Sequence, residues 1–309
     1  MTRQARTWDA PLRGEPKHSR PRRQSEISEL AAGLYVTATP IGNAQDVTLR
    51  ALDVLKGADL IAAEDTRVTA KLLAIFGIVK PLTSYNDHNG ARERPRLLAR
   101  LKEGARVALV SDAGTPLISD PGYRLVREAL AAGIEVHAIP GASAPLAALA
   151  LAGLPTDRFF FAGFLPAKRG ERRHTLEELK PIRATLIFFE APQRLAESLA
   201  DMAEILGCRP AAVARELTKL HEEVRRGDLA SLAQVYAQAP PRGEITLAVG
   251  PAGEQAADLS RVDSALGKAL AFMPVRAAVD LVAEMLQAPR REVYTRALAR
   301  KNDGRDPAS

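Results

Sequence analysis

The sequence has almost no cysteine and no long apolar run. Cys208 is the only cysteine among 309 residues, which excludes an intrachain disulfide and a metal cluster built from cysteines. No apolar stretch approaches the length of a membrane span, and the N-terminus lacks the apolar segment of a secretory signal. We therefore expect a cytoplasmic protein without a membrane-spanning segment.

Several common catalytic motifs are also missing. No G-x-G-x-x-G pattern follows the first expected strand, and no P-loop is present, so a standard dinucleotide enzyme and a P-loop NTPase are disfavoured. No serine lies in the nucleophile elbow of a hydrolase. The five histidines lack the spacing of metal ligands, so no metal is expected; His88, His174 and His221 are more typical of a surface or RNA-facing position.

The composition is that of a globular protein with a modest positive charge. Apolar residues make up 46% of the chain, and 309 residues suffice for two domains with cores. The formal net charge of +6 allows an anionic partner without requiring one. Residues 1–30 carry seven Lys and Arg against four Asp and Glu, which predicts a disordered basic tail. A solubilising role is favoured there over a weak electrostatic arm for nucleic acid.

Short apolar runs alternate with helical patterns through residues 31–154, which predicts an α/β domain with a mostly parallel sheet. A second α/β domain, with a mixed sheet, is expected over residues 155–252, where residues 168–174 are interpreted as a charged loop. Residues 253–309 are expected to form a linker and a small helical module divided at Pro289. The expected strands are 34–38, 60–63, 81–85, 107–110 and 135–139 in the first domain, and 159–164, 186–189, 211–214, 222–226 and 244–249 in the second.

The segment from Ser111 to Gly122 is the centre of the chain's pattern. It is a small-residue loop between an expected strand, residues 107–110, and a helical pattern, residues 123–132. Loops at the carboxyl ends of parallel strands bind ligands in open α/β sheets. This loop offers carboxylates, hydroxyl groups and backbone made approachable by Gly114. A capped turn, with Asp120 capping the next helix, explains Asp120 and Pro121 but not the other polar residues.

Small-residue loops lie at the ends of several other expected strands. Together they suit a cleft between two α/β domains that holds a neutral or zwitterionic ligand by backbone contacts. These loops are Thr39–Asn43 and Pro140–Ala144 in the first domain, and Glu190–Pro192, Arg215–Lys219 and Arg242–Glu244 in the second.

Six motifs in collinear order, from about Leu34 to Gly250, resemble the ribosomal RNA small subunit methyltransferase I family of the tetrapyrrole methylase superfamily. The motifs are Thr39–Asn43 with Asp46 and Thr48, Glu64–Arg67, Ser111–Gly122, Pro140–Ala144, Phe189–Pro192 with Arg194, and Arg215–Lys219. The resemblance implies two α/β domains with a cofactor cleft between them and a helix-turn-helix-like C-terminal module. It also implies S-adenosylmethionine as cofactor, 2′-O-methylation of a decoding-centre cytidine in 16S rRNA, the small ribosomal subunit as partner, and a homodimer.

The resemblance also assigns site residues, position by position. The cofactor is expected to contact Pro40, Gly42, Asn43, Asp112, Ala113, Gly114, Thr115, Leu117, Ser119, Asp120, Pro140, Gly141, Ser143, Ala144, Phe189, Glu190, Leu217 and Glu244. Glu64, Asp65, Arg67 and Lys219 are the expected catalytic residues, with Arg67 on a phosphate and one carboxylate near the 2′-oxygen. The base stays open among Glu64, Asp65, Asp112 and Glu190.

Three alternatives remain open at this point. The chain fits a tetrapyrrole methylase, or a non-catalytic ribosome-assembly protein that kept the fold. Three features favour RNA: the Glu64–Arg67 cluster, the Asn86–Asn89 loop, and the basic residues at Lys168–Arg173 and in the C-terminal module. A charge run, however, is usually a solvated face. The third alternative concerns the Glu64–Arg67 cluster, where Asp65 would cap the next helix and Arg67 would pair with Glu64.

Overall fold

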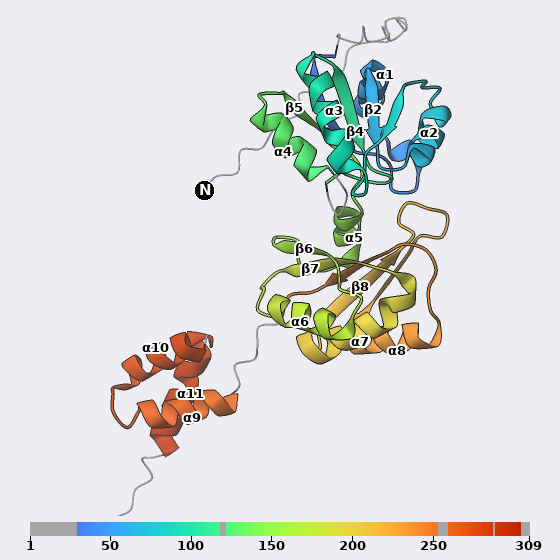
Figure 1. The fold of residues 1–309 in the computed structure, drawn as a ribbon. Coiled ribbons are helices and arrows are strands. Elements are labelled where there is room, and N and C mark those ends of the chain that lie inside the picture. The colour runs from blue at the N-terminus through green and yellow to red at the C-terminus, as the bar shows by residue number, and fades with distance from the viewer. Residues whose placement is uncertain (1–29, 118–121, 253–258, 287, 304–309) are drawn as a thin grey trace, which may run out of the picture. The chain divides into compact units, whose positions relative to one another are not determined.

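The computed structural model describes residues 30–117, 122–252, 259–286 and 288–303, which contain two five-stranded sheets (Figure 1). By their contacts, the described residues divide into two compact units. The first unit comprises residues 30–37, 48–110 and 122–139. The second unit comprises residues 38–47, 111–117 and the described residues from 140 onward. The expected basic tail at residues 1–29 lies outside the described residues.

The sheet of the first unit is parallel throughout, with the strand order β3-β2-β4-β1-β5. Its strands are β1 (Gly33–Thr37), β2 (Leu60–Ala63), β3 (Leu82–Ser84), β4 (Arg106–Val110) and β5 (Val136–Ile139). The apolar runs therefore predicted this sheet to within one residue at each end. Strands β1, β2 and nearly all of β4 are buried, as expected for a parallel sheet covered by helices.

Two helices of the first unit begin at a polar side chain that caps them. Thr48 accepts a hydrogen bond from the Ala51 amide and starts α1, and Asp65 accepts one from the Arg67 amide and starts α2. The helix after the central loop starts at Tyr123 with Gly122 at the N-cap position. Asp120, the expected cap, lies outside the described residues. The helices are α1 (Leu49–Gly57), α2 (Thr66–Ile75), α3 (Gly90–Lys102) and α4 (Tyr123–Ala131).

The sheet of the second unit is mixed, as predicted, with the order β6-β7-β10-β8-β9. Strands β6 and β7 are parallel, and the other neighbours are antiparallel. The strands are β6 (Phe159–Phe164), β7 (Thr185–Glu190), β8 (Pro210–Arg215), β9 (Glu223–Asp228) and β10 (Ile245–Val249).

Alternation along β8 and β10 sends side chains to two different cores. Val213 and Leu247 face the core beneath α6 (Arg169–Leu179), α7 (Leu195–Leu206) and α8 (Leu229–Gln238), which lie together on one side of the sheet in Figure 1. Ala212 and Ala248 face α5 (Ala144–Ala152) on the other side, where small side chains allow a close approach. The same alternation places the end of β8 beside the loops described below.

The expectation of a charged loop at residues 168–174 is wrong, because residues from Arg169 onward form α6. Arg172 is 1% exposed and is bound by the buried Asp201 carboxylate of α7 at 2.7 Å. Arg169 and Arg173 bind the same carboxylate at 3.2 Å. These arginines join two helices, which weakens the earlier argument that they contact RNA phosphates.

The C-terminal module consists of three helices around its own apolar core. They are α9 (Leu259–Ala269), α10 (Val275–Leu286) and α11 (Arg290–Asp303). The periodicity after Met273 predicted α10 and α11 with Pro289 between them, but α9 was not predicted. Among the described helices, none combines the length and the apolar character that crossing a membrane requires.

Candidate functional site

Three loops that follow β1, β4 and β5 are joined by backbone and side-chain hydrogen bonds within the second unit. Thr39 and Gly114 exchange two backbone hydrogen bonds, of 2.8 and 3.1 Å. The Thr39 hydroxyl donates to the Ser111 carbonyl at 3.2 Å, and the Thr115 hydroxyl donates to the Ala142 carbonyl at 3.2 Å. The structure therefore brings the expected cofactor loops 40–43, 112–117 and 140–144 together.

Glycine is required at two points of this loop cluster. A Cβ at Gly141 would lie 2.9 Å from the Ala38 Cβ, and one at Gly114 would lie 3.3 Å from Ile41 Cγ2. Gly114 also has a φ of +77°, a backbone conformation that residues other than glycine rarely adopt. These contacts are the physical reason for the small residues seen in the sequence.

The Arg215–Lys219 loop packs against the same cluster. Leu217, an expected cofactor residue, is 6% exposed and lies in a small core with Ile41, Ala148 and Ala214. Ala142 and Ala144 pack against this core. Two of the expected cofactor loops and the second sheet are thus held by one apolar cluster.

Strained backbone is concentrated in these loops. Among the described residues, the non-glycine residues with positive φ are Leu117 at 77°, Glu216 at 49° and Thr218 at 65°. Such conformations cost on the order of 1–3 kcal/mol each and cluster at ligand sites. The buried Thr218 hydroxyl also has no hydrogen-bond partner in the described part of the chain. Strained backbone beside an unsatisfied hydroxyl fits a site for a small polar ligand.

Lys219 lies in a double ion pair next to Gly42. Its ammonium binds the Glu216 and Glu244 carboxylates at 3.0 Å each, and Glu216 also accepts the Glu244 amide at 2.9 Å. Burial lowers the pKa of Lys219, but the two carboxylates outweigh it and leave the pKa raised. A Cβ at Gly42 would lie 2.4 Å from Lys219 Cγ. This geometry favours a positioning role for Lys219 over contact with a reacting oxygen.

The Glu190 carboxylate is held entirely by its own segment. It accepts hydrogen bonds from the Ser198 hydroxyl at 2.6 Å and the Ala191 amide at 2.8 Å, and it binds Arg194 at 2.6 Å. Its side chain is 1% exposed. A buried carboxylate whose oxygens are occupied by three donors of the protein is out of hydrogen-bonding reach of a substrate hydroxyl group. The neighbouring Phe189 ring contacts Phe161 and Phe164.

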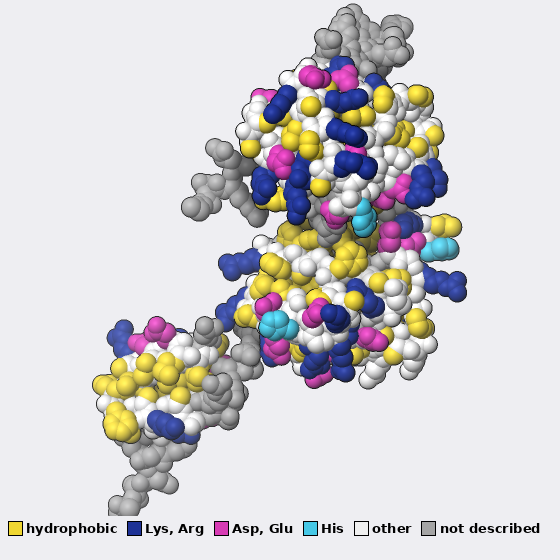
Figure 2. Space-filling model, in the orientation of Figure 1, with side chains coloured by type: hydrophobic (Ala, Val, Ile, Leu, Met, Phe, Trp, Pro, Cys, Tyr) yellow, Lys and Arg dark blue, Asp and Glu magenta, His cyan; other side chains and the backbone are white. Residues whose placement is uncertain are grey.

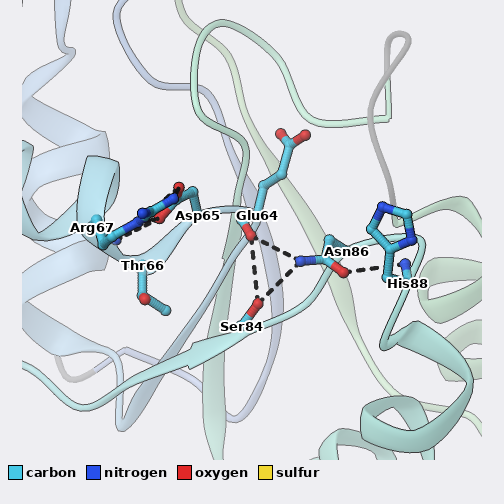
Figure 3. A pocket seen from close by; sticks show the side chains of 7 residues that line it. All are labelled: Glu64, Asp65, Thr66, Arg67, Ser84, Asn86 and His88. Atoms are coloured by element: carbon cyan, nitrogen blue, oxygen red, sulfur yellow. Dashed lines mark hydrogen bonds and ion pairs between the residues drawn. The ribbon is translucent and has the colours of Figure 1, made fainter.

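A pocket of about 350 Å³ lies in the first unit, where β2 and β3 end (Figure 3). This volume lies within the range of small-ligand sites. Its polar lining gathers two predicted clusters, the one after residue 63 and the one after residue 84. The lining residues are Glu64, Asp65, Thr66, Arg67, Ser84, Asn86 and His88.

Asp65 and Arg67 form a local structural pair in this pocket. The guanidinium of Arg67 binds the Asp65 carboxylate at 2.6 Å, and the Arg67 amide donates to it at 2.8 Å. These hydrogen bonds lower the pKa of Asp65 to about 2. The structure thus gives Asp65 the cap role considered above, and Asp65 also binds the Arg67 guanidinium. The Arg67 side chain remains 86% exposed and can reach an anion.

Hydrogen bonds fix the backbone beneath Glu64. Its amide donates to the Val110 carbonyl, and its carbonyl accepts the Asn86 side-chain amide at 3.3 Å. In Figure 3 the Glu64 carboxylate and the His88 ring rise on the same side of the Ser84–Asn86 network. Ser84 and His88 were not among the predicted site residues, although His88 stands in the polar run after the expected third strand.

The other predicted site residues fall into three groups. Asn43 caps a short 3-10 helix through its hydrogen bond with Gln45, and Ser143 occupies the N-cap position of α5. Pro40, Asp112, Ala113 and Pro140 lie in the joined loops of the second unit. Ser119 and Asp120 lie outside the described residues.

Comparison with known families covers most of the chain. Residues 33–233 match the family described as Tetrapyrrole (Corrin/Porphyrin) Methylases, and residues 255–301 match the RsmI C-terminal HTH domain. A protein of Mesorhizobium japonicum named ribosomal RNA small subunit methyltransferase I is 53% identical, covering 90% of this chain and 96% of that protein. A protein of the same name from Pseudomonas aeruginosa is 47% identical, covering 88% and 98%.

Solved structures share the fold at low sequence identity. Diphthine synthase has a TM-score of 0.56 at 18% identity, covering 70% of this chain and 89% of that one. The uroporphyrin-III C-methyltransferase of Thermus thermophilus, complexed with S-adenosylhomocysteine, has a TM-score of 0.51 at 20% identity, covering 74% and 99%. The likeness confirms the predicted α/β fold class, which here has two sheets and a C-terminal helical region.

Proposed function

We propose, on the premise that the chain belongs to the ribosomal RNA small subunit methyltransferase I family of tetrapyrrole methylases, that it methylates the ribose 2′-oxygen of a decoding-centre cytidine in 16S rRNA. It is a methyltransferase, and S-adenosylmethionine is its cofactor. The 2′-oxygen, the cytidine and the assembled small subunit are the finer parts of the proposal. Action in the cytoplasm and a homodimeric state complete it.

The cofactor is assigned to the joined loops of the second unit. Gly114, Thr115, Gly141 and Ala144 offer approachable backbone there, and Leu217 supplies an apolar wall. The unsatisfied Thr218 hydroxyl is available to a polar group of the ligand. The sulfonium of S-adenosylmethionine supplies an activated methyl group, so the chain must place and deprotonate the accepting oxygen.

The target nucleotide is assigned to the pocket of the first unit, and this pocket is the observation that carries the proposal. It combines a carboxylate at Glu64 with the exposed guanidinium of Arg67, and it has the volume of a small-ligand site. A guanidinium suits a backbone phosphate and a carboxylate suits a ribose hydroxyl group. Asp65 orients Arg67 through its carboxylate.

The C-terminal module is proposed to dock on the small ribosomal subunit. Some of its basic residues form ion pairs within the module, so fewer of them can contact phosphate than its composition indicates. Arg290 binds Asp280 and Arg296 binds Asp263, at 2.6 Å in each case. Arg291 remains exposed at the start of α11. Because pairing inside the module reduces its attraction for phosphate, shape and ribosomal context must supply specificity.

Ribose-methylation mapping of 16S rRNA tests the proposal most directly. Small subunits from cells lacking the protein should regain one 2′-O-methylated cytidine when incubated with purified protein and S-adenosylmethionine. Free unstructured RNA should be a poor substrate. No methylation of subunits, or equal methylation of short RNA, contradicts the proposal. Calorimetry with S-adenosylhomocysteine distinguishes two reasons for a missing activity. A non-catalytic protein that has lost the cofactor site does not bind this ligand, whereas an enzyme tested on the wrong substrate does.

A further inference from the structure

The segment that follows β3 is held by a network of amide and hydroxyl side chains. The Asn86 side-chain amide donates to Ser84 Oγ at 3.2 Å and to the Glu64 carbonyl at 3.3 Å. The Asn89 side-chain amide donates to the Ser84 carbonyl at 3.0 Å and to Ser84 Oγ at 3.1 Å. These side chains are therefore engaged inside the protein and fix the shape of the loop.

The same network places His88 at the pocket. The His88 amide donates to Asn86 Oδ1 at 3.1 Å, and the Asn89 amide donates to the same oxygen at 3.2 Å. Asn89 Oδ1 in turn accepts the Asn86 amide at 2.9 Å. In the part of the chain that the structure describes, no hydrogen bond or ion pair holds the His88 imidazole itself. A loop fixed by seven such bonds thus presents an exposed ring to the pocket (Figure 3).

Two of the four expected bases, Asp65 and Glu190, are engaged by other groups of the protein. Arg67 holds the Asp65 carboxylate in its charged form, with a pKa of about 2. Glu190 is buried with three donors. Histidine is the most frequent general base because an unperturbed imidazole changes charge near neutral pH.

We propose that the His88 imidazole accepts the proton of the target 2′-hydroxyl group, a role that rests on the proposed ribose methylation. The O–H bond breaks as its proton passes to an imidazole nitrogen. The oxygen's electron pair forms the new O–CH3 bond, and the S–CH3 bond of S-adenosylmethionine breaks with its pair going to sulfur. The proton then leaves to solvent from the exposed ring. Glu64 orients the hydroxyl group beside it.

The test compares His88→Ala with wild-type protein on small subunits at saturating S-adenosylmethionine. We expect kcat to fall about 10²- to 10⁴-fold, the usual contribution of a general base. The KM for subunits should change less than about threefold, because a base acts mainly in the transition state. Added imidazole should restore part of the His88→Ala rate and none of the Glu64→Gln rate. His174→Ala, which removes an exposed histidine of α6, is the matched control.

Binding measurements keep the result interpretable. His88→Ala should bind S-adenosylhomocysteine and small subunits like wild type, which establishes that the variant is folded. A raised KM with unchanged kcat would make His88 a binding residue and overturn the proposal, as would normal turnover or absence of imidazole rescue. If the wild-type protein does not methylate subunits, the proposed function fails instead, so the two failures are distinguishable.

Discussion

Charged residues stand at strand ends in both units, but their hydrogen bonds go to different places. In the second unit, Glu190, Glu216 and Glu244 bind Arg194 and Lys219, so the charges neutralise one another. In the first unit, Asp65 and Arg67 also pair, but asparagine side chains and backbone groups carry the network beside Glu64 and His88, which line a pocket. The position after a strand therefore does not define a role. The destination of each hydrogen bond does.

The largest stability effect is expected where charges are most completely buried. Asp201→Asn removes the charge that Arg172 binds at 2.7 Å, and the two side chains are 3% and 1% exposed. Breaking a buried pair this way typically costs about 3–5 kcal/mol. Denaturant unfolding should show this loss of stability. The methylation rate per folded molecule should stay at the wild-type value. Glu204→Gln, on the same helix and 59% exposed, should cost less than about 1 kcal/mol. Equal effects of the two changes would contradict the assignment.

A second pair of changes compares the units directly. Glu190→Gln should lower the free energy of unfolding by about 1.5–3 kcal/mol, the usual value of hydrogen bonds to a buried charge. Glu64→Gln should change stability by less than about 1 kcal/mol and reduce methyl transfer at least about tenfold, because its carboxylate lines the pocket. Thermal melting and single-turnover methylation measure both effects. A catalytic loss with Glu190→Gln at unchanged stability would reverse the comparison.

Local patterns predicted the elements because most strands are short apolar runs between polar turns. The strand β6 was predicted at its observed bounds, Phe159–Phe164. The helix α6 was missed because its sequence is mostly charged, and only its burial against Asp201 makes it a helix of the core. Periodicity cannot show a partner from another segment.

The candidate site was predicted in part for the same reason. Small-residue loops indicated where backbone comes close, and Gly114 and Gly141 do have neighbours within 3.3 Å of a built Cβ. The partners of Lys219 could not be read from sequence, because Glu244 lies 25 positions away. The sequence also could not show that the Asn86 side chain forms hydrogen bonds inside the protein, while His88 lines the pocket.

A size exchange tests the positioning role of Lys219. Gly42→Ala should lower the affinity for S-adenosylhomocysteine about tenfold, since its Cβ would lie 2.4 Å from Lys219 Cγ. Lys219→Ala removes the aliphatic part of the side chain that this Cβ would meet. The double variant Gly42→Ala/Lys219→Ala should therefore bind S-adenosylhomocysteine more tightly than the sum of the two single losses of binding free energy predicts. Contacting residues show coupling of about 0.5–3 kcal/mol. Calorimetry on the four proteins of the cycle gives the coupling. Strict additivity would remove Lys219 as the support of this loop.

The smallest effect concerns two aspartates with the same depressed pKa at opposite ends of one strand. Hydrogen bonds from Arg106 lower the pKa of Asp59 from 3.8 to about 2, and Arg67 does the same for Asp65. Because the folded-state pKa values are depressed, each charge stabilises the protein above about pH 4. That contribution disappears as the pH falls through 4 towards 2. Asp59 is 41% exposed, so solvent screening keeps its contribution below about 1 kcal/mol.

Asp59→Asn and Asp65→Asn therefore form a matched pair. Each should flatten the fall in melting temperature between pH 4 and pH 2. Only Asp65→Asn should also reduce methyl transfer at pH 7, because Asp65 orients the guanidinium that we assign to a phosphate, whereas Asp59 lies before β2, at the end away from the pocket. The two variants thus share the loss of a carboxylate held by an arginine, and they lie at opposite ends of β2. Equal turnover in both would leave the Asp65–Arg67 pair a helix cap alone.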